Sequence, residues 1–442
     1  MNFPISRFES IETPFYFYDL SLLQQTLNEL KKAEEAHPRF HVHYAIKANA
    51  NPRILQLIAA KGFGADCVSG GEVQAALNAG FPADKIVFAG VGKSDKEISL
   101  SLKAGISCFN VESTPELEVI NEIAASLGVT ARVALRVNPN IDAHTHAKIT
   151  TGLNENKFGI PAEDLVKVIA FVKTLNNLEL VGVHYHIGSQ ITEPEPFRHL
   201  CEHINEWQEK LRAEGISLPS LNVGGGLGID YVAPDANPIP PFADHLDLFA
   251  RHLNLREDQE LHFELGRSVV AQCGSLISRV LYVKEGHTKK FLIVDAGFTD
   301  LIRPALYDAH HFTQNISATD QTATATYDVV GPICESSDVF SENEHLPLSH
   351  RGDLIAFRSA GAYGEVMAST YNCRTLPAAV FSEDCQHVTR IQHTVSVKSL
   401  TAPKPPNATP ARYGKVRKCA AKQHQNTVER LSPRKTSTKS SH

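Results

Sequence analysis

The 442-residue sequence lacks several features of membrane, secreted and zinc-binding proteins. It has no run of about 18 apolar residues, so we expect no helix that spans a membrane. The opening segment MNFPISRFES has no basic stretch followed by an apolar run and a small-residue cleavage site, so no secretory signal is predicted. The eight cysteines show no CxxC spacing, which argues against zinc or thioredoxin-like motifs and fits reduced thiols. These absences predict a cytoplasmic protein without a resident metal.

Charge is distributed unevenly along the chain. From Cys385 to His442 there are 12 Lys and Arg against one acid, Glu429, whereas the preceding residues hold 31 bases against 48 acids. The tail 385–442 is also rich in Ser, Thr, Pro and Gln, a composition that predicts disorder. It has few interleaved aromatic residues and the rest of the chain is acidic, so we expect no nucleic-acid partner.

Short apolar runs alternate with amphipathic segments through the first 270 residues. Eight of them are strand candidates: 41–48, 63–69, 85–90, 108–113, 132–139, 178–188, 220–224 and 260–264. Segments with helical spacing lie between them, at 51–60, 71–79, 114–127, 162–176 and 194–213. This alternation is typical of a (β/α)8 barrel of the TIM type, with a doubly wound open sheet as the competing architecture. Polar or glycine residues at nearly every strand end favour the barrel, because a barrel gathers those ends around one pocket.

The pattern changes after Arg267 to strand-like segments with little helix, at 276–283, 290–295, 326–330 and 353–357. We therefore expect a (β/α)8 barrel over 39–270 and an all-β domain over 271–384, followed by the tail 385–442. The aromatic run from Pro14 to Tyr18 lies before the barrel, so residues 1–38 are predicted to contribute a strand and a helix to the β domain.

Lys47 ends the first predicted barrel strand, within the segment YAIKANAN. A lysine at such a position is expected to face away from solvent, where an unpaired ammonium is costly. Either its pKa falls or the amine is used in a covalent bond, such as an imine with an aldehyde. An ordinary lysine with its charge at the surface is the alternative. The surrounding motifs favour a Schiff-base lysine.

Two further motifs follow predicted barrel strands. The glycine cluster GGGLG at 224–228 lets backbone N–H groups approach an anion such as phosphate, although tight turns use the same residues. His184 and His186 share one face of a strand and could bind a metal, as in barrel hydrolases, with His144, His146, His310 and His311 as loosely placed further ligands. A histidine packed over an aromatic cofactor and a satisfied core histidine are the other interpretations.

Ten ordered motifs carry a specific resemblance from about Thr13 to about Phe381. They are YAIKAN (44–49), GADCVSGGE (64–72), NVES (110–113), RVNP (136–139), KFGI (157–160), HIGSQ (186–190), GGGLG (224–228), RPALY (303–307), GPICESSD (331–338) and AGAY (360–363). The chain resembles the diaminopimelate decarboxylase family, pyridoxal-phosphate enzymes of the alanine-racemase-like fold type. Two departures are Leu265, where the family usually has proline, and the basic tail, where it usually has a final strand and an acidic helix.

The resemblance implies that pyridoxal 5'-phosphate is the cofactor and assigns residues to it. Lys47 would form the imine, Glu264 would keep the pyridine nitrogen protonated and His186 would stack on the ring. The other cofactor-binding residues implied are Asp66, Ser189, Gly224, Gly225, Gly226, Gly266, Arg267 and Tyr363.

Cys334 and Glu335 belong to GPICESSD, which resembles the segment that a partner subunit contributes in this family. The resemblance implies a homodimer with shared active sites, in which Cys334 reprotonates the α-carbon. A buried inert cysteine is the structural alternative.

The remaining implied residues concern the substrate, a small amino acid. Arg267, Arg303, Tyr307 and Tyr363 resemble the family's substrate binders, and Glu335 its partner for the distal ammonium. The resemblance therefore implies decarboxylation of meso-diaminopimelate to L-lysine, the last step of lysine biosynthesis. An ornithine- or arginine-type decarboxylase and a catalytically silent cofactor-binding homologue are the alternatives.

Overall fold

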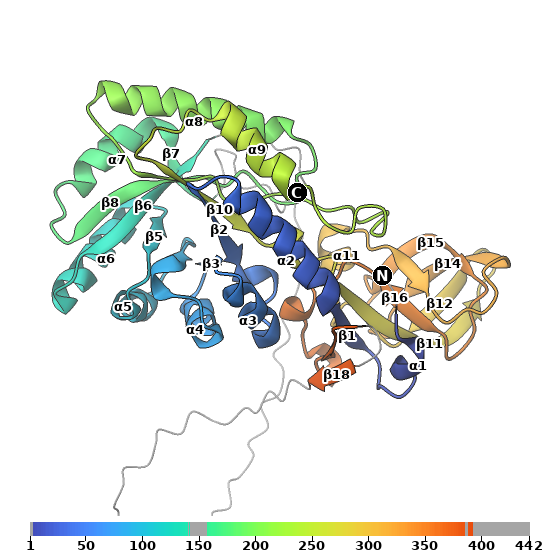
Figure 1. Cartoon of the computed structure of the whole chain (residues 1–442). Coiled ribbons are helices and arrows are strands. Elements are labelled where there is room, and N and C mark those ends of the chain that lie inside the picture. The colour runs from blue at the N-terminus through green and yellow to red at the C-terminus, as the bar shows by residue number, and fades with distance from the viewer. Residues whose placement is uncertain (1–2, 140, 142–156, 385–387, 392–442) are drawn as a thin grey trace, which may run out of the picture. The chain divides into compact units, whose positions relative to one another are not determined.

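The computed structural model describes residues 3–139, 141, 157–384 and 388–391. Its two main elements are a barrel of parallel strands and a nine-stranded mixed sheet (Figure 1). None of the helices in these ranges combines the length and apolar character that a membrane span needs.

Eight parallel strands close the barrel, which confirms the predicted fold class. In order around the barrel they are β2 (Phe40–Ala45), β3 (Gly64–Cys67), β4 (Ile86–Phe88), β5 (Cys108–Val111), β6 (Ala131–Asn138), β8 (Leu178–His184), β9 (Ser220–Asn222) and β10 (Glu260–Leu265). The pairing of β10 with β2, in which Glu264 lies opposite His43, completes the ring. A two-residue strand, β7 (Ile160–Pro161), adds to β6 outside it.

Helices surround the barrel strands (Figure 1). They are α2 (Leu20–Glu35), α3 (Pro52–Ala60), α4 (Gly70–Ala79), α5 (Asp95–Ala104), α6 (Thr114–Leu127), α7 (Leu165–Val172), α8 (Glu195–Ala213) and α9 (Phe242–His252). Local sequence marks several of their ends. The side chains of Asn51, Ser69 and Ser113 accept hydrogen bonds from the first turns of α3, α4 and α6. Gly80 and Gly128 end α4 and α6 in the left-handed conformation that glycine adopts without strain.

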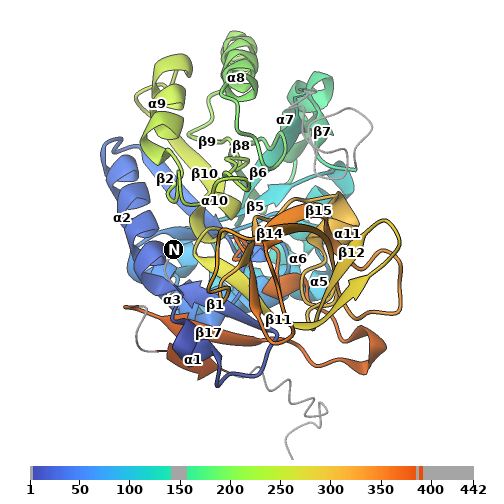
Figure 2. The same ribbon diagram turned by 90° about the vertical axis from the view of Figure 1, so that its right-hand side faces the viewer.

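The second sheet confirms that the N-terminal strand joins the C-terminal β segments. Its main order is β15 (Val339–Pro347), β14 (Thr324–Val330), β12 (Lys290–Val294), β11 (Gly274–Glu285), β1 (Phe15–Asp19), β17 (Ala378–Ser382) and β18 (Val388–Ile391). β16 (Leu354–Phe357) also pairs with β11, and β13 (Thr313–Asn315) pairs with β16. Figure 2 shows β1, in blue, among the orange and yellow strands. It pairs antiparallel with β11 and parallel with β17.

Two expectations about the chain ends are wrong in part. Helix α2 was expected in the β domain, but it packs beside α9 on the barrel because its apolar residues, including Leu23, Leu27 and Leu30, are fully buried in the core that also contains the barrel strands. Residues 388–391 were expected in a disordered tail, but they form β18 antiparallel to β17. Residues 392–442 lie outside the described residues. The predicted domain boundaries stay predictions.

His245 on α9 predicts a pH dependence of stability. Its ring is buried among Phe197, Phe249 and Phe263, at centroid distances of 4.7, 5.4 and 6.0 Å. Burial lowers the pKa of His245 from 6.5 to about 4. The unfolded chain therefore takes up a proton near pH 6.5 that the folded chain refuses until about pH 4. We expect this group to contribute a loss of about 3 kcal/mol in the free energy of unfolding as the pH falls through that window.

The variant His245→Phe keeps an aromatic ring in place and removes the titrating group. Urea unfolding at a series of pH values should show a shallower loss of stability between pH 6.5 and 4 than in the wild type. His199→Gln, at an exposed histidine on α8, is the control and should leave the slope unchanged. An unchanged slope in His245→Phe would show that this ring does not resist protonation.

Candidate active site

Lys47 lies just beyond the carboxyl end of β2, in a short 3-10 turn from Ile46 to Ala48. Ile46 and Ala48 are buried on either side of it, whereas the Lys47 side chain is 39% exposed. The turn is fixed from the segment between β16 and β17, because the Tyr363 amide donates to the Ala48 carbonyl at 2.8 Å. The location at a strand end agrees with the sequence prediction, but the expectation that Lys47 faces away from solvent is wrong.

Asp66 at the end of β3 is the acidic neighbour of Lys47, with Oδ2 3.6 Å from Nζ. Both Asp66 oxygens are buried and have no hydrogen-bond partner among the described residues. Burial and the charge of Glu264 raise the pKa of Asp66 to about 7, against the lowering effect of Lys47. Burial lowers the pKa of Lys47, but Asp66, Tyr363 and Glu264 together raise it above its usual range. Of the two outcomes expected for this lysine, the lowered pKa is not found, and Asp66 is placed to stabilise the ammonium form of Lys47.

Glu264 is held by hydrogen bonds from three other barrel strands. Its Oε1 accepts from Asn110 Nδ2 at 3.0 Å and from Asn222 Nδ2 at 2.8 Å, and its Oε2 lies 3.0 Å from His184 Nε2. Burial raises the pKa of the Glu264 carboxyl, but His184 and then Lys47 lower it by more, so the net pKa is below its usual range. The site therefore contains a fixed carboxylate at the centre of the barrel mouth.

His186 and the glycine cluster meet at the ends of β8 and β9. The Gly225 amide donates to His186 Nδ1 at 3.3 Å. Gly224 and Gly226 have φ values of +69° and +115°, and a Cβ on Gly225 would lie 2.1 Å from the Glu264 carbonyl oxygen. The three glycines are therefore required by close backbone packing against β8 and β10. Burial, followed by the charge of Lys47, lowers the pKa of His186.

A second group of predicted residues surrounds two buried arginines. Arg267 begins the short helix α10 (Arg267–Val270) after β10, and Arg303 begins α11 (Arg303–Tyr307), which ends at the predicted binder Tyr307. Arg267 Nη2 donates to Ser189 Oγ at 3.0 Å, and its guanidinium lies 4.9 Å from the Tyr363 ring centroid. These contacts bring three of the predicted site residues together, namely Ser189, Arg267 and Tyr363.

The described hydrogen bonds of Cys334 and Glu335 lie outside this cluster. Both residues follow β14 and are exposed. The Cys334 amide donates to Asn372 Oδ1 at 3.4 Å, and the Tyr371 hydroxyl donates to the Glu335 carboxylate at 2.7 Å. Within the described part of the chain, their hydrogen bonds run to this loop and not to Lys47 or Arg303. No described hydrogen bond therefore links Cys334 or Glu335 to the other predicted site residues.

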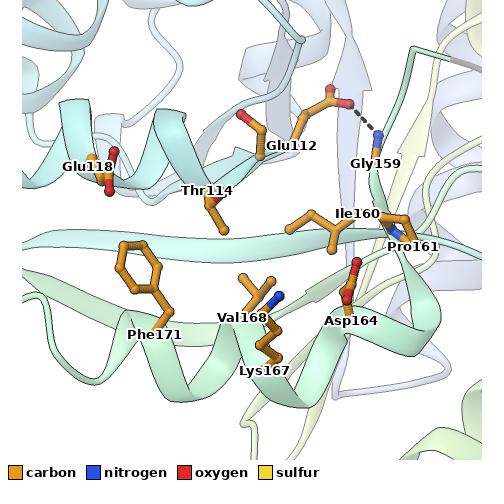
Figure 3. Close-up of a pocket in the computed structure, with 11 residues that line it drawn as sticks. Glu112, Thr114, Glu118, Gly159, Ile160, Pro161, Asp164, Lys167, Val168 and Phe171 are labelled. Atoms are coloured by element: carbon orange, nitrogen blue, oxygen red, sulfur yellow. Dashed lines mark hydrogen bonds between the residues drawn. The ribbon is translucent and has the colours of Figure 1, made fainter.

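A separate pocket of about 540 Å³ lies between α6 and α7 (Figure 3). Its lining combines acidic Glu118 and Asp164 with apolar Val168 and Phe171, and none of the predicted site residues contributes to it. Glu112 lies at its edge, where its carboxylate accepts from the Gly159 amide at 3.0 Å and pairs with Arg136 Nη1 at 2.8 Å. This pocket is distinct from the candidate active site.

The metal-site hypothesis gains no support from the geometry. The described ranges contain no group of three or more His, Cys, Asp or Glu side chains arranged to hold a metal ion. His184 instead contacts Glu264, and His311 lies beside Arg303. His144 and His146 lie outside the described residues.

Several residues of the site were missed by sequence reasoning. Asn110 and Asn222 hold Glu264, and His184 acts with them, a role that was not among the interpretations considered for it. The period-two alternation of polar residues at strand ends was a signal for all three. Tyr231 contacts Arg267 from 36 residues away and His311 contacts Arg303 from eight residues away, and neither contact carries a signal in sequence spacing.

Comparison with known proteins agrees with this arrangement. The family model "Pyridoxal-dependent decarboxylase, pyridoxal binding domain" matches residues 23–271. A diaminopimelate decarboxylase of Bacteroides thetaiotaomicron is 57% identical over 382 residues, which cover 86% of this chain and 98% of that protein.

Similar solved structures include decarboxylases as well. The diaminopimelate decarboxylase of Helicobacter pylori, crystallised with L-lysine, matches with a TM-score of 0.81 and 42% identity, covering 87% of this chain and 95% of that one. A lysine/ornithine decarboxylase from Vibrio vulnificus, at 24% identity and a TM-score of 0.74, covers 86% of this chain and 96% of that one and shares the fold. The chain belongs to the pyridoxal-dependent decarboxylases and, within them, to the diaminopimelate decarboxylase family.

Proposed function

We propose that this chain removes one carboxyl group of meso-2,6-diaminopimelate as carbon dioxide to give L-lysine, with pyridoxal 5'-phosphate as cofactor and Lys47 as its attachment point. One observation carries the proposal. The amine of Lys47 lies beside Asp66 and the fixed carboxylate of Glu264 at the ends of the barrel strands, and the site also contains two buried arginines. The family relationship supports the same activity.

The residues present fit the cofactor. Buried Asp66 has two oxygens without a hydrogen-bond partner among the described residues, and the buried Nε of Arg267 likewise has none. Such groups are costly unless a bound molecule satisfies them. Lys47 Nζ would hold the cofactor covalently, and Ser189, Arg267, Tyr363 and the glycine cluster would hold its phosphate. Gly266, where an added Cβ would lie 3.1 Å from the Cβ atoms of Ala45 and Ala48, would contribute backbone.

Bound pyridoxal phosphate supplies an electron sink for the electron pair that the departing carbon dioxide leaves. The chain's own groups prepare that chemistry. Asp66 would stabilise the Lys47 ammonium before the cofactor binds, and the Glu264 carboxylate would supply the negative charge that keeps the ring nitrogen protonated. His186 would stack on the ring. The Cys334 thiol of a second subunit would return a proton to the α-carbon.

The substrate's far end decides specificity. Arg267, Arg303 and Tyr307 would bind the carboxylate that is retained, and Glu335 of a partner subunit would bind the distal ammonium. A guanidinium suits a carboxylate because it donates two parallel hydrogen bonds. This arrangement requires at least a homodimer with shared active sites. The cytoplasmic location and the place in lysine biosynthesis are further parts of this proposal.

A product assay with diaminopimelate, ornithine and arginine in parallel tests the function. Ornithine and arginine lack the second carboxylate, so both buried arginines would stay unpaired. We expect kcat/KM for diaminopimelate to exceed that for either by on the order of 10⁴. Ornithine turned over as efficiently as diaminopimelate would contradict the proposal, and cofactor binding without carbon dioxide release would indicate a silent homologue. Gel filtration of the same preparation measures the assembly state.

A further inference from the structure

The two buried arginines share one aromatic ring. The Arg303 guanidinium lies 4.8 Å from the centroid of Tyr231, and the Arg267 guanidinium lies 5.9 Å from it. Neither pairs with a carboxylate among the residues the structure describes. Burial and the charge of Arg267 lower the pKa of Arg303. Two like charges are thus held close together in a buried site, which is costly unless an anion joins them.

Neutral groups, rather than acids, accept the hydrogen bonds of these arginines. The Tyr231 hydroxyl accepts from Arg267 Nη1 at 2.7 Å, and His311 Nε2 lies 2.8 Å from Arg303 Nη1. An Asp or Glu at either place would orient the guanidinium equally well, but it would also cancel the charge. A neutral acceptor holds the group in place and leaves its charge available.

The surroundings of His311 fix which ring nitrogen accepts. His311 Nδ1 lies 2.8 Å from the carbonyl oxygen of Arg358, which can only accept a hydrogen bond. Nδ1 therefore has the proton, and Nε2 presents a lone pair to Arg303. Arg358 is itself anchored by an ion pair with Asp235 at 2.7 Å. Burial, followed by the charge of Arg303, lowers the pKa of His311 to about 3, so the ring stays neutral.

We infer that His311 and Tyr231 are positioning residues that make this site selective for a ligand carboxylate, by holding Arg303 and Arg267 in place without neutralising them. The inference rests on the proposed function and deepens it. Decarboxylation removes only one carboxyl group of diaminopimelate, so the product L-lysine keeps the group that the arginines would bind. Cadaverine has the same chain and two ammonium groups but no carboxylate. Comparing L-lysine with cadaverine therefore isolates the interaction of the ligand carboxylate with the arginines.

Calorimetric titration of the holoenzyme with L-lysine and with cadaverine tests the inference. In the wild type, L-lysine should bind more tightly than cadaverine by about 100-fold. His311→Phe removes the acceptor and should reduce this preference by about 10-fold while the affinity for cadaverine stays unchanged. His311→Gln, whose amide can accept from Arg303 and donate to the Arg358 carbonyl, should restore most of it. His310→Gln, at the exposed neighbour, is the control and should behave as the wild type.

Tyr231→Phe supplies a second variant that keeps the ring and removes only the acceptor of Arg267, should His311→Phe fail to fold. It should reduce the lysine preference to a similar extent and raise KM for diaminopimelate more than it lowers kcat. A wild type without a lysine preference would contradict the carboxylate site, and with it the proposed function. A wild type with the preference, retained in full by a folded His311→Phe or Tyr231→Phe protein, would overturn the positioning role alone.

Discussion

Lys47→Ala is expected to abolish turnover of diaminopimelate, with a loss in kcat of more than about 10³-fold. The reason is that Lys47, in the turn after β2, is the amine placed beside Asp66 at the end of β3, and alanine has no amine to replace it. The variant should fold, because the Lys47 side chain is 39% exposed and its contact with Asp66 is long, at 3.6 Å. Carbon dioxide release from diaminopimelate is the measurement.

Lys96→Ala is the matched control, since Lys96 is an exposed lysine on α5. It should leave kcat unchanged. If Lys47→Ala retained a tenth or more of the wild-type kcat, Lys47 could not be the amine on which the reaction depends.

Mixing two inactive variants is expected to restore activity if the site is shared between subunits. Lys47→Ala removes the attachment amine, and Cys334→Ala removes the proton donor that lies on the exposed segment after β14. In a mixed dimer, one site combines the Lys47→Ala substitution of one subunit with the Cys334→Ala substitution of the other and has both defects. The second site combines the intact Lys47 and the intact Cys334 and has neither. Random exchange of subunits makes half of the dimers mixed, so about a quarter of the wild-type activity should return.

The control for this experiment mixes Lys47→Ala with Glu264→Ala. Both residues line the same barrel mouth of one chain, so every mixed site would keep a defect and no activity should return. Recovery in the control, or the absence of recovery with Cys334→Ala after confirmed subunit exchange, would contradict a site built from two subunits.

The barrel could be predicted from the sequence because its strands are short apolar runs that end in polar residues. All eight predicted strands are present, although the first ends at Ala45 and leaves Lys47 in a turn. Helix α2 was placed on the wrong element, since an amphipathic pattern shows that a helix is buried but not against which neighbour. Strands β13, β15 and β17 were missed, because pairing with distant segments rather than local sequence determines them.

The sequence allowed the charged residues and the glycines of the site to be predicted. It did not allow prediction of the neutral side chains that hold the charged ones in place. Glu264 follows a predicted strand, but Asn110 and Asn222 reach it only because the barrel is closed. Tyr231 meets Arg267 across 36 residues of sequence, and His311 meets Arg303 only because the chain turns back after the helix α11. Burial suggested a lowered pKa as one of two outcomes for Lys47, whereas Asp66, Tyr363 and Glu264 outweigh burial and raise it. The balance between burial and nearby charges depends on interatomic distances, which the sequence does not give.

Hydride trapping of the holoenzyme tests the central claim most directly. Reduction with borohydride, followed by peptide mass spectrometry, should locate the cofactor mass on the peptide that contains Lys47, at close to one per chain. The same treatment of Lys47→Ala should leave that peptide unmodified. An adduct on another lysine, or no adduct in an active preparation, would contradict the account.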